Sequence, residues 1–149
     1  MSAGMLAPAW MHLQVTADEY DSWSEEQCAG IPDFDVRLQD VPLTNRRPDV
    51  VVYRAAAIDN TPMRPEHVAL VVEVVSPGSE TTDRIAKPSQ YAEAGIPFYW
   101  RVEQLASSAP VTYTYVLDPA TRRYRDSDVF TGTIKVSAPF AVEIHLEEP

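Results

Sequence analysis

The middle of the chain reads RPDVVVYR at residues 47–54, VALVVEVVSP at 68–77 and DRIAKPSQYAEAGIPFYWRVE at 83–103. The first two segments hold runs of β-branched residues, which predict strands at 50–53 and 68–75. The second run is almost unbroken, as is typical of an interior strand covered on both faces. The third segment predicts a helix from about residue 82 to residue 94, a stop at Gly95 and a strand at FYWRV.

The flanking segments extend this pattern on both sides. A capping box at Thr16 and Glu19 predicts a helix at 17–28 that stops near Gly30, followed by a polar connection rich in proline. After the central segment, VTYTYVL at 111–117 predicts a strand, and VFTGTIKV and PFAVEIHL predict two closing antiparallel strands. The fold class is therefore α/β (α+β), with a mixed central sheet flanked by helices.

Length and composition predict a single domain over residues 1–149, with a short N-terminal segment (1–43), a motif-bearing core (44–103) and C-terminal strands (104–149). The chain has 45% hydrophobic and 23% charged residues. It contains no apolar run long enough for a membrane span and begins without a leader-like pattern, which favours a cytoplasmic protein. The single cysteine, Cys28, has no disulfide partner and is expected near a helix end.

The net charge of −10 counts against a nucleic-acid partner, because phosphate binding usually needs a basic surface. The acids are concentrated in residues 1–43, which hold eight acids and one base, whereas residues 44–103 hold eight acids and seven bases. These seven bases could follow a DNA backbone if the fold gathers them on one face: Arg46, Arg47, Arg54, Arg64, Arg84, Lys87 and Arg101.

Three residues of the central stretch have the chemistry of a metal-dependent hydrolase. Asp49 precedes a strand and Glu73 lies inside one. Lys87 is expected either just before a helix that Pro88 starts or within a helix that begins at Asp83 and is kinked by Pro88. Carboxylates suit a hard divalent cation, and a lysine balances the charge of a phosphate. Each also has a structural interpretation: Asp49 as a turn cap, Glu73 as an arginine partner and Lys87 as a solvated side chain.

Other candidates are weaker. His12, His67 and His145 are far apart and have no cysteine companions, which argues against zinc. Ser76 follows a strand, but the G-x-S-x-G pattern is absent. Tyr91, Tyr99 and Trp100 are expected in the core, although Tyr91 lies one helical turn from Lys87 and could face the site. The run from Arg122 to Arg125 is expected at a solvated hairpin tip.

From Pro48 to Glu103, and more loosely to Leu146, the chain resembles the Uma-type putative restriction endonuclease family of the PD-(D/E)XK nuclease superfamily. The resemblance rests on four elements in order: Pro48-Asp49 before a valine strand, Glu73 to Pro77, then Asp83, Lys87 and Tyr91, and finally Ala94 to Pro97 with Tyr99 and Trp100. It implies a restriction-endonuclease-like core.

The resemblance assigns roles residue by residue. Asp49 and Glu73 match metal-binding acids, and the carbonyl of Val74 is a third candidate ligand. The superfamily's lysine two residues after the second acid is replaced by Val75, and Lys87 stands where Uma-type proteins supply that lysine from the next helix. Because Glu73 and Val75 share one face of their strand, a lysine from a neighbouring helix can reach the same volume.

The resemblance also leaves a gap. Family members usually begin with a helix and a hairpin around an acidic turn, and no counterpart of that turn is found before Asp49. Glu19, Glu25 or Glu26 could supply the missing acid, although helix-start acids commonly only complement the dipole. The gap predicts a sheet that lacks one flank, which a second protomer of a homodimer could cover.

The sequence thus predicts a Mg²⁺-dependent endonuclease that acts on DNA phosphodiesters, with Mn²⁺ as a substitute metal. Two alternatives stay open. The first is an inactive nuclease-fold protein that serves in dimerisation or partner binding, which the short N-terminal segment and the acidic balance favour. The second is an acidic interaction module unrelated to nucleases, which would be favoured if residues 48–103 did not form strand, strand, helix and strand.

Overall fold

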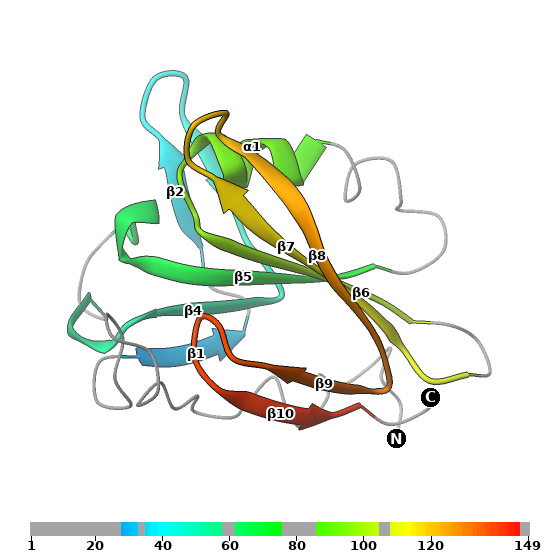
Figure 1. The fold of residues 1–149 in the computed structure, drawn as a ribbon. Helices are drawn as coiled ribbons and strands as arrows, with labels where there is room; N and C mark the ends of the chain where they lie inside the picture. The colour runs from blue at the N-terminus through cyan, green and yellow to red at the C-terminus, as the bar shows by residue number, and fades with distance from the viewer. Residues whose placement is uncertain (1–27, 33–34, 58–61, 76–85, 105–107, 147–149) are drawn as a thin grey trace.

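The computed structural model describes residues 28–32, 35–57, 62–75, 86–104 and 108–146 (Figure 1). Its centre is a six-stranded mixed sheet with the strand order β1-β4-β5-β6-β7-β8. Strands β5 and β6 are parallel, and all other neighbours are antiparallel. The strands are β1 (Cys28–Pro32), β4 (Val50–Arg54), β5 (Val68–Val75), β6 (Phe98–Glu103), β7 (Val111–Asp118) and β8 (Arg123–Thr131).

Shorter elements complete the described chain. A hairpin of β2 (Val36–Gln39) and β3 (Thr44–Arg46) precedes β4, and two 3-10 turns, η2 (Ala55–Ala57) and η3 (Pro65–His67), lie between β4 and β5. Helix α1 (Lys87–Glu93) belongs to the crossover that the parallel pair β5–β6 requires. A second hairpin, β9 (Thr133–Val136) with β10 (Val142–His145), ends the fold.

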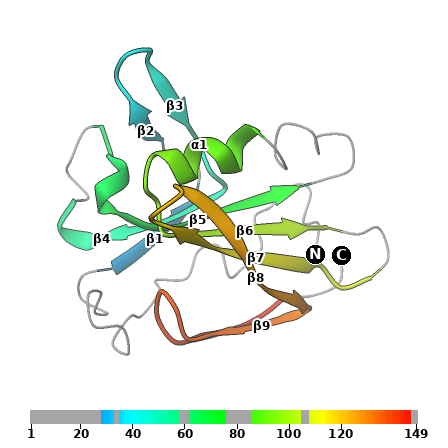
Figure 2. The ribbon, with the colours of Figure 1, turned by 45° about the horizontal axis from the view of Figure 1, so that its top comes forward.

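Each face of the sheet is covered by a different layer. Helix α1 and the β2–β3 hairpin lie above the sheet in Figure 1, and the β9–β10 hairpin lies below it, an arrangement that Figure 2 shows from a second side. Because side chains alternate along a strand, Val50, Val52 and Val72 face the hairpin, whereas Val51 and Val71 face the helix. Two separate apolar cores result.

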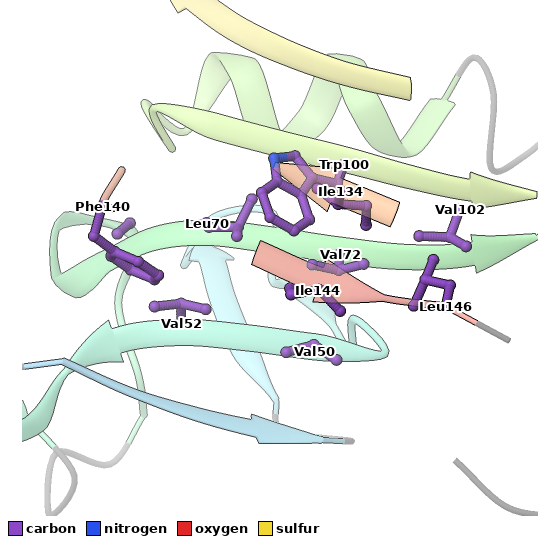
Figure 3. Packing of buried hydrophobic residues seen from close by; sticks show 11 residues of the cluster. Val50, Val52, Leu70, Val72, Trp100, Val102, Ile134, Phe140, Ile144 and Leu146 are labelled. Carbon is purple, nitrogen blue, oxygen red and sulfur yellow. The ribbon is translucent and has the colours of Figure 1, made fainter. Parts of the chain in front are cut away.

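The core below the sheet joins strand and hairpin residues. Figure 3 shows Trp100 of β6 close to Ile134 of β9, and Ile144 of β10 over the middle of the sheet. Ile134 is fully buried, and Phe140, in the connection between β9 and β10, is 1% exposed. Burying a side chain of this size typically contributes about 1.5–3 kcal/mol. The β9–β10 hairpin therefore covers this face of the sheet and buries its apolar side chains.

The predicted strands of residues 50–117 are confirmed. The segment VFTGTIKV, expected as one closing strand, is divided at Gly132 into the end of β8 and β9, and PFAVEIHL contains β10. The helix ends as expected: Gly95 has φ of +90° and its N–H donates to the carbonyl of Ala92 at 3.0 Å. Its described part begins at Lys87, with Pro88 in the first turn, and residues 82–85 of the predicted helix lie outside the described residues.

Three expectations about the N-terminal third are wrong where the structure describes it. Cys28 and Gly30 belong to strand β1 and not to a helix end, because their backbone pairs with β4. The rest of the predicted helix at 17–28, and Glu19, Glu25 and Glu26 with it, lie outside the described residues. The polar connection before Asp49 contains the β2–β3 hairpin, and both faces of the sheet are covered, so the predicted open flank is absent from the described part of the fold.

Candidate active site

Glu73 is a buried acid on the helix-covered face of the sheet. It lies two residues after Val71 on β5, so both side chains point toward α1. Its exposed fraction is 3%. Lys87 Nζ lies 3.6 Å from Glu73 Oε1, and the hydroxyl of Tyr91 donates to Oε2. The carboxylate is thus held between two side chains of the same helix.

Asp49 lies beside Glu73 at the end of the β4–β5 ladder. Val50 pairs with Val72, so the same register places Asp49 opposite Glu73, and strand alternation places both carboxylates on the helix-covered face. Asp49 Oδ2 accepts a hydrogen bond from the N–H of Val74 at 2.6 Å. The carboxylate of Asp49 therefore accepts the hydrogen bond of Val74 in place of a backbone carbonyl, one residue before strand β4 begins.

Lys87 reaches the site from the start of α1, and the helix is fixed at two further points. Arg46 of β3 donates through Nε to Gln90 Oε1 at 2.6 Å. Arg122, in the turn between β7 and β8, donates through Nη1 to the carbonyl of Glu93 at 2.8 Å. The side chain of Lys87 is 24% exposed. It is therefore accessible to a ligand and still close to Glu73.

Tyr91 is a core residue that also contacts the candidate acid. It is fully buried, and its ring lies 5.8 Å from that of Tyr99 between centroids. Burial raises the pKa of its hydroxyl far above the usual range, and the nearby charge of Glu73 raises the pKa further. The hydroxyl therefore keeps its proton and acts as a permanent donor to Glu73.

Arg101 is a neighbour of the site that the sequence did not identify as one. The parallel register of β5 and β6 pairs it with Glu73. Its Nε donates to Glu103 Oε2 at 2.9 Å, its Nη1 donates to the hydroxyl of Tyr115 at 2.8 Å, and its guanidinium lies 4.5 Å above the ring of Tyr113. Because side chains alternate along a strand, Arg101 and Glu103 lie on one face of β6. Only the register between β5 and β6 shows that Arg101 adjoins Glu73.

The oxygen donors at this point suit a hard cation. Within the described ranges, no group of three or more histidine, cysteine, aspartate and glutamate side chains gathers at one place. Mg²⁺ is often held by only one or two carboxylates, with waters completing its octahedron. Asp49 and Glu73 are the two carboxylates here that would hold such an ion.

The other basic residues of the central stretch are dispersed. Arg47 pairs with Asp35 at 2.8 Å, and Arg64 pairs with Asp40 at 2.9 Å on the β2–β3 hairpin. These hydrogen bonds hold the pKa of each aspartate below its usual value. Arg84 and Ser76 lie outside the described residues. Much of the expected positive charge is thus matched locally by carboxylates.

A mixed sheet with an acid before one strand, a second acid in the next strand and a lysine from the following helix defines the class of restriction-endonuclease-like proteins. The chain belongs to the Uma2 family, described as "Putative restriction endonuclease", whose model matches residues 12–147. This family membership confirms the resemblance inferred from the central motifs. No protein with curated annotation matches the chain significantly. None of the helices in the described ranges is long and apolar enough to cross a membrane.

Proposed function

We propose that this protein is a Mg²⁺-dependent endonuclease that hydrolyses DNA phosphodiester bonds, with Asp49, Glu73 and Lys87 as its active-site residues. The observation that carries the proposal is the buried carboxylate of Glu73 on the same face as Asp49, with Lys87 Nζ at 3.6 Å. Family membership supports nuclease chemistry and a DNA substrate.

Each residue has a separate task in this proposal. Asp49 and Glu73 hold Mg²⁺ or Mn²⁺, and the carbonyl of Val74 is a third candidate ligand. When bound, such a metal lowers the pKa of a water molecule and neutralises charge on phosphate oxygens. Lys87 stabilises negative charge that develops on the phosphate, and Tyr91 orients the carboxylate of Glu73.

The competing proposal is a protein that keeps the nuclease fold without the activity and serves in dimerisation or partner binding. Its support is the net charge of −10, which opposes DNA. Homodimerisation and a cytoplasmic location stay predictions under either proposal. The two proposals differ in one measurable respect, which is metal-dependent DNA cleavage that depends on Glu73 and Lys87.

The test is cleavage of supercoiled plasmid and of oligonucleotides with Mg²⁺ or Mn²⁺. Wild type is compared with Glu73→Gln and Lys87→Met, and with the matched controls Glu143→Gln and Lys135→Met. Both control residues are exposed on the β9–β10 hairpin, on the opposite side of the sheet. Removing one charge-stabilising group typically costs a factor of about 10²–10³ in rate, and we expect at least this loss for both site variants.

The controls should retain wild-type rates. Equal cleavage by wild type and both site variants would identify a contaminating nuclease. No cleavage by any sample, across supercoiled, linear and single-stranded substrates, would favour the inactive nuclease-fold protein.

A further inference from the structure

We infer that a groove beside the candidate active site binds a second backbone phosphate of the DNA, next to the phosphate that is cleaved. This inference rests on the proposed function. The groove has a volume of about 570 Å³ and lies between α1 and the turn that joins β7 to β8. Residues from α1, β6, β7 and β8 line it, so it is built by segments far apart in the sequence.

The charge of the groove is opposite to that of the chain. Three arginines line it, Arg101, Arg122 and Arg123, against one carboxylate, Glu93, and the charge of Arg101 is already paired with Glu103 at 2.9 Å. The whole chain carries a net charge of −10. A local excess of guanidinium groups in an acidic protein favours an anionic ligand, and arginine matches phosphate oxygens through its fork of N–H groups.

Arg122 has a backbone conformation that usually favours glycine. Its φ is +55°, and its N–H closes the turn on the carbonyl of Asp118 at 2.8 Å. A non-glycine residue in this region carries a conformational cost, which persists only where the surrounding structure holds the residue in place. One hydrogen bond to the carbonyl of Glu93 orients the guanidinium, and no other residue that the structure describes accepts from its remaining N–H groups, which can therefore meet a ligand in the groove.

Arg101 connects the groove to the active site. Its side chain is held by Glu103 and by the hydroxyl of Tyr115, and its backbone pairs with Glu73 in the parallel register. On the other wall, Ser89 lies two residues after Lys87. A DNA strand with its scissile phosphate beside Lys87 would therefore pass the wall of the groove that holds Ser89, and Arg122 would meet a neighbouring phosphate.

The test is the salt dependence of DNA binding without divalent metal, which does not require cleavage. Binding of a short labelled duplex is followed by fluorescence anisotropy in EDTA, for wild type, Arg122→Gln and the matched control Arg125→Gln. Arg125 belongs to the same hairpin and is exposed, but it does not line the groove and lies 4.0 Å from Asp118. Both variants remove one positive charge, so only a direct phosphate contact distinguishes them.

Each phosphate contact contributes about 0.9 to the slope of log K against log salt on duplex DNA. We expect Arg122→Gln to lose about 0.9 from this slope, whereas Arg125→Gln keeps the wild-type slope. Between about 50 and 200 mM NaCl, wild-type affinity should fall about threefold more than that of Arg122→Gln. Thermal unfolding by circular dichroism would verify that both variants are folded.

Equal slopes for wild type and Arg122→Gln would overturn the inference, even if the plasmid assay confirms the nuclease. Arg122-dependent binding of inorganic phosphate or a mononucleotide, without DNA binding, would overturn it as well and assign the groove to a free phosphate compound. A reduced slope in Arg122→Gln, combined with no cleavage by wild type, would support the phosphate site and reject the proposed reaction.

Discussion

Glu73 is costly to bury, and its contacts show how that cost is offset. An ionised carboxylate that leaves water loses several kcal/mol of hydration even after the protein relaxes around it. The hydroxyl of Tyr91 offsets part of this loss, whereas Lys87, at 3.6 Å and partly exposed, contributes less than a direct hydrogen bond would. An acid kept at such cost in an apolar strand is typical of a functional site.

Tyr91→Phe tests the hydrogen bond to Glu73. A hydrogen bond to a charged group typically contributes about 1.5–3 kcal/mol, so we expect the free energy of unfolding at neutral pH to fall by about 2 kcal/mol. Urea unfolding measures the change. Tyr113→Phe is the matched control, because the hydroxyl of Tyr113 makes no hydrogen bond with any residue that the structure describes.

Tyr91→Phe should also change how the free energy of unfolding depends on pH. Because the pKa of Tyr91 is raised in the folded protein, its hydroxyl stays protonated while the unfolded chain loses that proton above its model value of 10.0. Wild-type stability should therefore be fully present below pH 10 and fall above it, by about 1.4 kcal/mol per pH unit for this group. The stability difference between wild type and Tyr91→Phe should narrow by about 1 kcal/mol from pH 10 to pH 11, because a tyrosine of the unfolded chain is already half ionised at pH 10. A constant difference would mean that the pKa of Tyr91 is not raised in the folded protein.

The positions of the candidate site residues could be predicted from the sequence better than their surroundings. The acids Asp49 and Glu73 and the base Lys87 could be named because motif order and strand alternation already place them on one side of the sheet. Arg101 could not, since its proximity to Glu73 depends on the register between two strands that are separated by a helix. The hydrogen bond of Tyr91 likewise requires the packing of α1 on the sheet.

The β9–β10 hairpin is the element on which the lower face of the sheet depends. Ile134→Ala should lower the free energy of unfolding by about 2–5 kcal/mol, because a fully buried isoleucine leaves a cavity when it is truncated. Val129→Ala is the control: Val129 on β8 is 61% exposed, and its change should stay within about 0.5 kcal/mol. Urea unfolding of both variants measures the difference. If Ile134→Ala lowers the free energy of unfolding by less than about 1 kcal/mol, the β9–β10 hairpin contributes little to this core.

The strands that could not be predicted from the sequence are those without a regular alternation of apolar and polar residues. Strand β1 contains Gly30 and Pro32, and its strand character follows from pairing with β4, which no local pattern reveals. The β2–β3 hairpin has mostly polar residues and was expected as a connection. It is anchored by Val36, which is fully buried, and by the N–H of Arg37, which donates to the carbonyl of Met63 at 2.9 Å.

The protein as a whole combines an acidic chain with a locally basic groove. Its acids are concentrated toward the N-terminal segment, and on the β2–β3 hairpin they pair with Arg47 and Arg64. Few arginines are thus available for phosphate, which predicts a shallow salt dependence of DNA binding. A shallow dependence suits an enzyme that engages the backbone near its metal and not over a broad surface.

Metal binding is the most direct test of the proposed site, because it requires no DNA substrate. Mn²⁺ is titrated by calorimetry into wild type, into the double variant Asp49→Asn/Glu73→Gln and into Glu143→Gln. We expect one Mn²⁺ site of equal affinity in wild type and Glu143→Gln, and an affinity at least about tenfold lower in the double variant. Equal binding by all three proteins, or no binding by wild type, would show that Asp49 and Glu73 do not form a metal site.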